Sequence, residues 1–155
     1  MDFLEKITRD LAEGMKSHED ERELVVSVLR MIKSTVKNAE IALRGSAREL
    51  KEEDIISVLS TMVKQRKEAA EQYNGAGRKD LADKEEREIK IIQRYLPRQL
   101  TIEELDALIR AAIEETGVTS QKEAGRLMKV LMPQVKGKAD GKVVNQRVRE
   151  ILESN

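Results

Sequence analysis

Residues 25–45 read VVSVLRMIKSTVKNAEIALRG, and this stretch decides the fold class. Its apolar side chains recur at steps of three and four, which places one apolar stripe along a single face of a long helix. Gly45 suits the end of that helix, because glycine adopts the left-handed conformation that commonly follows a last helical turn. The same spacing recurs on both sides of the stretch and predicts further helices over residues 4–15, 55–73 and 81–96.

Pro97 marks the boundary between two parts of the chain, because a proline seldom continues a helix. We therefore predict an all-α protein of two subdomains. Residues 1–97 are expected to form an N-terminal array of four helices, and residues 98–155 a C-terminal bundle of three helices. The composition agrees: aromatic side chains make up only 2% of the chain, so Leu, Ile, Val, Met and Ala must fill the core, as is usual between helices.

Short sequence signals predict the three C-terminal helices. Thr101–Glu104 and Ser120–Glu123 have the pattern of a capping box, in which a hydroxyl and a carboxylate satisfy unpaired amides at a helix start. Pro133 is expected at the end of the second of these helices. The last helix is expected to begin after Asp140-Gly141 and to bury Val144, Val148, Ile151 and Leu152.

Charge is balanced over the whole chain but unevenly distributed along it. The 29 basic and 29 acidic side chains cancel, yet residues 117–155 carry a net +4 and the first 116 residues a net −4. A basic tail indicates an anionic partner. No apolar run approaches the roughly 20 residues that a membrane-spanning helix needs, and the charged N-terminus does not resemble a signal peptide. We therefore expect a cytoplasmic protein without membrane contact.

The residues offer little for catalysis or metal binding. The chain has no cysteine and a single histidine, His18, which we expect to be a solvated surface side chain; a zinc site wants several such ligands. No Walker sequence, dinucleotide fingerprint or nucleophile elbow is present. We therefore predict no catalytic residue, no metal and no cofactor, and no catalysis by the chain on its own.

Two segments stand out from the charged background. In the first, Lys64–Glu68, Arg66 lies near the extension of an apolar stripe, where it can pair with a carboxylate of a neighbouring helix or reach a ligand. In the second, Val135–Asn145, Gly137 suits a left-handed helix end and Asp140 can cap the next helix. The second segment also gathers lysines around a helix N-terminus, a common way to hold a phosphate. Both interpretations of each segment stay open.

Several separated motifs, in the same order, resemble those of the YqeY family, which shares a helical module with the C-terminal end of GatB, the B subunit of the tRNA-dependent amidotransferase. They are Lys64–Glu68, Tyr95–Leu100, the helix from Ala124 to Pro133, and Lys136–Gly141 with Val144-Asn145. The resemblance implies the same all-α GatB/YqeY architecture, and a tail that in the amidotransferase touches the elbow of tRNA. The amidotransferase commonly has Gly-Lys-Ala-Asn-Pro where this chain has Gly137–Gly141, and the acidic cap disfavours phosphate at that helix start.

The resemblance and the basic tail together lead to one main hypothesis and two alternatives. We expect a non-catalytic accessory protein that binds tRNA or another structured RNA through Lys129, Lys136, Lys138, Lys142 and Arg147. The first alternative is a protein–protein adaptor that docks on a synthetase or an amidotransferase. The second, which the family's usual label implies, is carbon–nitrogen ligase activity with glutamine as the amido-nitrogen donor, and then only together with other subunits.

Overall fold

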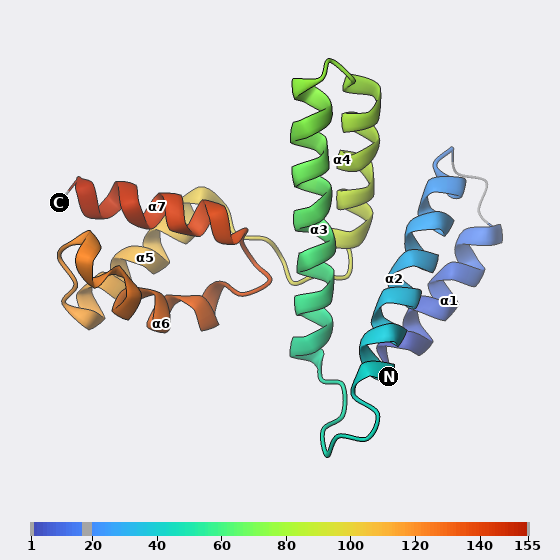
Figure 1. Cartoon of the computed structure of the whole chain (residues 1–155), viewed down its shortest axis with the longest axis horizontal. Helices are drawn as coiled ribbons and strands as arrows, with labels where there is room; N and C mark the ends of the chain where they lie inside the picture. The colour runs from blue at the N-terminus through green and yellow to red at the C-terminus, as the bar shows by residue number, and fades with distance from the viewer. Residues whose placement is uncertain (1, 17–19, 155) are drawn as a thin grey trace. The chain divides into compact units, whose positions relative to one another are not determined.

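The computed structural model describes residues 2–16 and 20–154, and within these ranges it contains seven α-helices, one 3-10 turn and no strand (Figure 1). The all-α prediction is confirmed. The chain divides into two compact units, Met1–Leu96 and Pro97–Asn155. The prediction that His18 is a solvated surface side chain concerns a residue outside the described ranges.

The N-terminal unit consists of two pairs of consecutive helices. Helix α1 (Phe3–Lys16) packs on α2 (Arg22–Ala42), and α3 (Glu52–Gly75) packs on α4 (Lys79–Gln93) (Figure 1). Helix α2 also contacts α3 and α4, so it joins the two pairs. The apolar stripe of residues 25–45 is buried between them. The core of the unit is made of Ile7, Leu11, Val28, Leu29, Ile32, Val36, Leu59, Met62, Val63, Ile89, Ile91 and Ile92.

The C-terminal unit has a separate core. Helices α5 (Ile102–Thr116), α6 (Ala124–Val135) and α7 (Gly141–Glu153) surround it, and a 3-10 turn, η1 (Gln121–Glu123), precedes α6. The predicted capping box of α5 is present: Thr101 Oγ1 accepts from the Glu104 amide at 3.1 Å, and Glu104 Oε1 accepts from the Thr101 amide at 3.2 Å. The core side chains include Leu105, Ile109, Val118, Leu127, Leu131, Val135, Val144, Val148, Ile151 and Leu152.

Two details of the prediction for α6 are wrong. Ser120 does not cap the helix through its side chain, because η1 intervenes and the Glu123 carboxylate pairs with Arg126 at 2.7 Å instead of returning to the Ser120 amide. Pro133 lies inside α6 and does not end it. The helix continues for one more half-turn because Val135 is completely buried, and burial of this side chain offsets the hydrogen bond that proline cannot donate.

Candidate functional site

The turn between α6 and α7 carries the lysines that the sequence singled out. The amides of Lys138 and Ala139 donate to the carbonyl of Val135 at 2.9 and 3.1 Å, which closes the end of α6. Gly137 has a φ of +76°, the left-handed conformation that the sequence predicted at this position. A side chain at residue 137 would be strained there, so glycine is what allows the chain to reverse between the two helices.

The turn is tied to the start of the C-terminal unit. The side-chain amide of Gln99 donates to the carbonyl of Gly137 at 2.8 Å and to that of Pro97 at 2.9 Å. The backbone amide of Leu100 donates to the carbonyl of Lys138, also at 2.8 Å. Two consecutive carbonyl groups of the turn are therefore held by donors from residues 99 and 100. Sequence reasoning did not assign a role to Gln99, although it lies in one of the motifs that carry the family resemblance.

The predicted cap of α7 is formed. Asp140 Oδ1 accepts from the backbone amide of Lys142 at 2.9 Å, and the helix runs from Gly141. The cap explains why the chain enters α7 where it does, since the first amides of a helix lack intrahelical partners. Its carboxylate also places a negative charge at the helix start, which lowers the attraction of that end for an anion.

We call Lys129, Lys136, Lys138 and Lys142 the basic turn surface; all four side chains are exposed. Lys129 lies on α6, and Lys136 is the residue that follows the last residue of this helix. Within the described parts of the chain, Lys129, Lys136 and Lys138 have no ion pair. Their ammonium groups are therefore available to an external anion without breaking an internal contact.

Arg147 has a different environment from these lysines. Its guanidinium donates to both carboxylate oxygens of Asp106 on α5, with Nε to Oδ1 at 2.8 Å and Nη2 to Oδ2 at 2.7 Å, and it also pairs with Glu150. The hydrogen bond from Arg147 holds the pKa of the Asp106 carboxyl below its ordinary value. Such a two-point pair fixes α7 against α5. We therefore place Arg147 in the packing of the unit and leave it out of the basic turn surface.

Arg66 is buried in the N-terminal unit. Its Nε lies 3.6 Å from Glu88 Oε2 on α4, and its Nη1 donates to the Met62 carbonyl at 3.1 Å. The remaining amino group contacts the Met31 sulfur of α2 at 2.6 Å. The guanidinium thus links α3 to α4 and α2. The sequence had offered such a pair with a carboxylate of a neighbouring helix as one of two roles for Arg66. Next to Glu88, burial and then the charge of Glu88 raise the pKa of Glu85.

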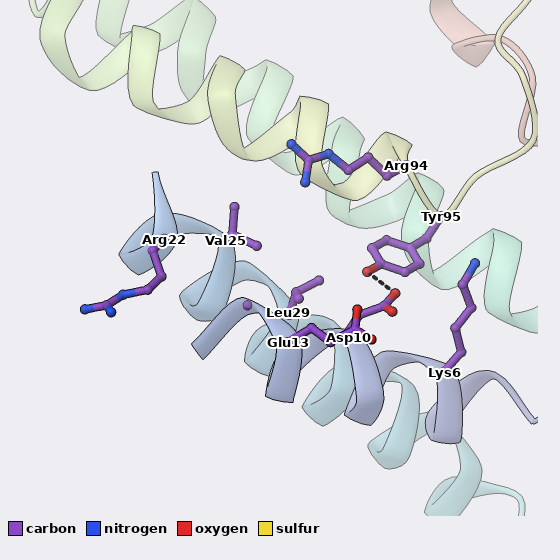
Figure 2. Close-up of a pocket in the computed structure, with 9 residues that line it drawn as sticks. Lys6, Asp10, Glu13, Arg22, Val25, Leu29, Arg94 and Tyr95 are labelled. Carbon is purple, nitrogen blue, oxygen red and sulfur yellow. Dashed lines mark hydrogen bonds between the residues drawn. The ribbon is translucent and has the colours of Figure 1, made fainter. Parts of the chain in front are cut away.

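The N-terminal unit has a groove of about 400 Å³ between α1, α2 and the end of α4. Figure 2 shows Val25 extending from α2 toward α4, and Tyr95 extending from the end of α4 toward α1. The Tyr95 hydroxyl donates to Asp10 Oδ2 at 2.7 Å, and the Lys6 ammonium lies 5.3 Å from the centre of the Tyr95 ring. Burial, followed by the hydrogen bond to Asp10, raises the pKa of Tyr95, so its hydroxyl stays protonated at neutral pH.

The charged groups of this groove do not converge on one point. Arg94 and Arg22 also line it, but the Arg22 side chain points away from Tyr95 (Figure 2). The Tyr95–Asp10 hydrogen bond instead ties the end of α4 to α1, and Phe3 packs edge-on against the same ring at 6.0 Å. Sequence reasoning missed this contact because residues 10 and 95 are far apart in the chain.

The described residues contain no group of three or more His, Asp or Glu side chains placed to hold a metal ion. His18 lies outside the described residues. The ammonium groups of exposed lysines on an ordered turn can hold an anion such as phosphate. The basic turn surface is therefore the candidate site, and binding is the chemistry that it offers.

Comparison with known proteins gives the family. The sequence model of the Yqey-like protein family matches residues 4–152, nearly the whole chain. The chain belongs to the YqeY family. Its relatives include Altered inheritance of mitochondria protein 41, mitochondrial, from Vanderwaltozyma polyspora, which is 34% identical over 90 residues that cover 58% of this chain and 46% of that protein. The chain therefore spans about half the length of that relative.

Two other relatives extend the picture of this YqeY family member. An uncharacterised protein from Schizosaccharomyces pombe is 35% identical over 91 residues, which cover 59% of this chain and 69% of that protein. The protein 41 of Pyrenophora tritici-repentis is 25% identical over 154 residues, which cover 96% and 80% of the two chains. The names of the two proteins 41 place those relatives in mitochondria.

Among the helices of the described residues, none is both long and apolar enough to cross a membrane. The cytoplasmic location of this YqeY family member stays a prediction, and so do its contact with tRNA and any part in an amidation reaction.

Proposed function

We propose that this YqeY family protein is an accessory RNA-binding protein that holds a folded RNA, such as tRNA, by its phosphate backbone. The contact residues of the proposal are Lys129, Lys136, Lys138 and Lys142. The observation that carries it is the ordered basic turn: three of these lysines have no ion pair among the described residues, and hydrogen bonds from Gln99 and Leu100 hold the backbone between α6 and α7. Lysine ammonium groups in such a position favour phosphate.

The class of RNA follows from what the C-terminal unit lacks. All three aromatic residues of the chain, Phe3, Tyr73 and Tyr95, belong to the N-terminal unit. Proteins that bind single strands usually stack bases on aromatic side chains, and residues 97–155 contain none. Contacts from lysines alone recognise the arrangement of phosphates, so we propose a folded RNA that is bound without regard to base sequence.

The test is binding of bulk tRNA to the purified chain, followed by fluorescence anisotropy at several salt concentrations. Replacement of Lys129, Lys136 and Lys138 by Glu removes three phosphate contacts, so the slope of log affinity against log salt should shrink by roughly 2 to 3. The matched control reverses the same amount of charge at Lys37, Lys64 and Lys84 on the N-terminal unit. A control that weakens binding as much as the test variant would show that net charge, and not this surface, attracts the RNA.

A further inference from the structure

Gln99 carries no charge, but its side chain is hydrogen-bonded to the α6–α7 turn. Its side-chain amide has two hydrogens, and each has an acceptor: one donates to the Pro97 carbonyl at 2.9 Å and the other to the Gly137 carbonyl at 2.8 Å. Gln99 thus joins two backbone segments that are 38 residues apart in sequence. Its donors are fully used inside the protein.

The hydrogen bonds occupy two carbonyl groups of the turn. Carbonyl oxygens carry partial negative charge and repel phosphate, so a phosphate-binding turn works best when its carbonyl groups have donors of their own. Gln99 satisfies the carbonyl of Gly137, and the Leu100 amide satisfies that of Lys138. The exposed Lys136 and Lys138 side chains flank these two carbonyls.

We infer that Gln99 is a positioning residue for RNA binding: it fixes the Lys136–Asp140 turn in the conformation in which the lysines meet phosphate. The inference rests on the proposed function. Without the Gln99 amide, the Gly137 carbonyl is released and the turn must be ordered again whenever RNA binds. If the Lys136–Asp140 turn becomes ordered only when RNA binds, the affinity falls, because part of the binding free energy is used to order the turn.

The experiment compares Gln99→Met with a matched glutamine variant, Gln121→Met. Gln121 also donates its side-chain amide to a distant carbonyl of the same unit, that of Arg149 at 3.0 Å, but it lies away from the basic turn. We expect Gln99→Met to weaken binding of bulk tRNA roughly five- to tenfold, as loss of one net hydrogen bond would do. Gln121→Met should leave the affinity unchanged although it loses the same type of bond.

A double-mutant cycle separates positioning from a merely structural role. In a chain that already carries Lys136→Ala and Lys138→Ala, Gln99→Met should weaken the remaining binding less than twofold, since there are no lysines left on the turn to position. An equal loss in both backgrounds would overturn the inference. Melting temperatures of all variants, followed by far-ultraviolet circular dichroism, check that each is folded at the assay temperature. Should Gln99→Met unfold the unit, Gln99→Asn, which keeps an amide but is shorter by one methylene group, takes its place in the same cycle.

The same measurements separate the positioning role of Gln99 from RNA binding by the chain. Absence of salt-dependent tRNA binding by the unaltered chain would contradict the proposed function, and the role of Gln99 with it. Normal binding by the unaltered chain together with normal binding by Gln99→Met would contradict only the positioning role.

Discussion

The two units differ in whether they bury charged side chains, since both buried charged residues of the described chain, Arg66 and Glu88, belong to the N-terminal unit. Residues 1–96 hold 19 basic and 20 acidic side chains and residues 97–155 hold 10 and 9, so neither unit is strongly charged as a whole. The N-terminal unit places an arginine and a carboxylate inside, where Arg66 and Glu88 have side chains only 11% and 10% exposed. The C-terminal unit keeps its lysines outside, on an ordered turn. Placement in the fold, and not the number of charges, therefore separates a packing residue from a candidate binding residue.

The largest effect is expected where a charge is buried. Arg66→Ala leaves Glu88 without its partner inside the N-terminal unit, and loss of one member of a buried pair typically costs about 3 to 5 kcal/mol of unfolding free energy. Urea unfolding followed by tyrosine fluorescence measures this, because both tyrosines, Tyr73 and Tyr95, belong to the N-terminal unit.

A double variant sharpens the same measurement. Arg66→Met with Glu88→Leu removes both charges, so it should recover most of the stability that Arg66→Ala loses, because no unpaired charge then remains inside. Equal stability of Arg66→Ala and the unaltered chain would mean that the pair is solvated and that the contrast between the units is wrong.

Arg147 tests the distinction between packing residues and binding residues within the C-terminal unit, because it is basic but paired with Asp106. Arg147→Met removes its hydrogen bonds to Asp106, and the melting temperature of the chain should fall slightly, because a partly exposed pair contributes little to stability. The salt dependence of tRNA binding should stay as it is, since Arg147 is engaged inside the protein. A loss of slope equal to that of a lysine variant would show instead that Arg147 contacts phosphate, as the sequence predicted.

The smallest expected effect is on the stability of the fold at acidic pH. Glu104 accepts hydrogen bonds from Arg98 and from the Thr101 amide, and these lower its pKa from 4.5 to about 2. Between these two values the unfolded chain binds more protons than the folded one. The contribution of Glu104 is therefore complete above about pH 4.5 and is lost as the pH falls toward 2. Melting temperatures between pH 2 and 6 should fall less steeply in Glu104→Gln than in the unaltered chain.

The third hypothesis, carbon–nitrogen ligase activity, can be tested by a turnover assay. The purified chain, given ATP, glutamine and charged tRNA, should form no amidated product, because we propose that the basic turn surface holds phosphate and that amidation needs other subunits. Product formed without any added subunit would contradict this expectation. An amidotransferase reconstituted from its own subunits serves as the positive control.

Local signals in the sequence predicted much of the fold. The period of the apolar residues gave the helices, and Gly137 and Asp140 gave the turn before α7, because each acts through its own backbone neighbours. Contacts between distant residues could not be predicted in this way. Neither the Arg147–Asp106 pair nor the Gln99 hydrogen bond has a local pattern, and both became visible only once the helices were packed.

The predictions that proved wrong also depended on contacts between distant residues. Pro133 was expected to end α6, but burial of Val135 two residues later carries the helix past it, and burial depends on the packed unit. The C-terminal unit as a whole is also nearly neutral. Residues 117–155 carry a net +4, but α5 adds acidic residues to the same unit.

The central claim is that four lysines on and beside the ordered α6–α7 turn meet the phosphates of a folded RNA, and the salt dependence of tRNA binding by the unaltered chain tests it most directly. Four phosphate contacts predict a slope of about −3 in log affinity against log salt, and so a roughly fiftyfold loss of affinity between 50 and 200 mM salt. Affinity that stays constant over this range, or no binding at 50 mM, would contradict the account.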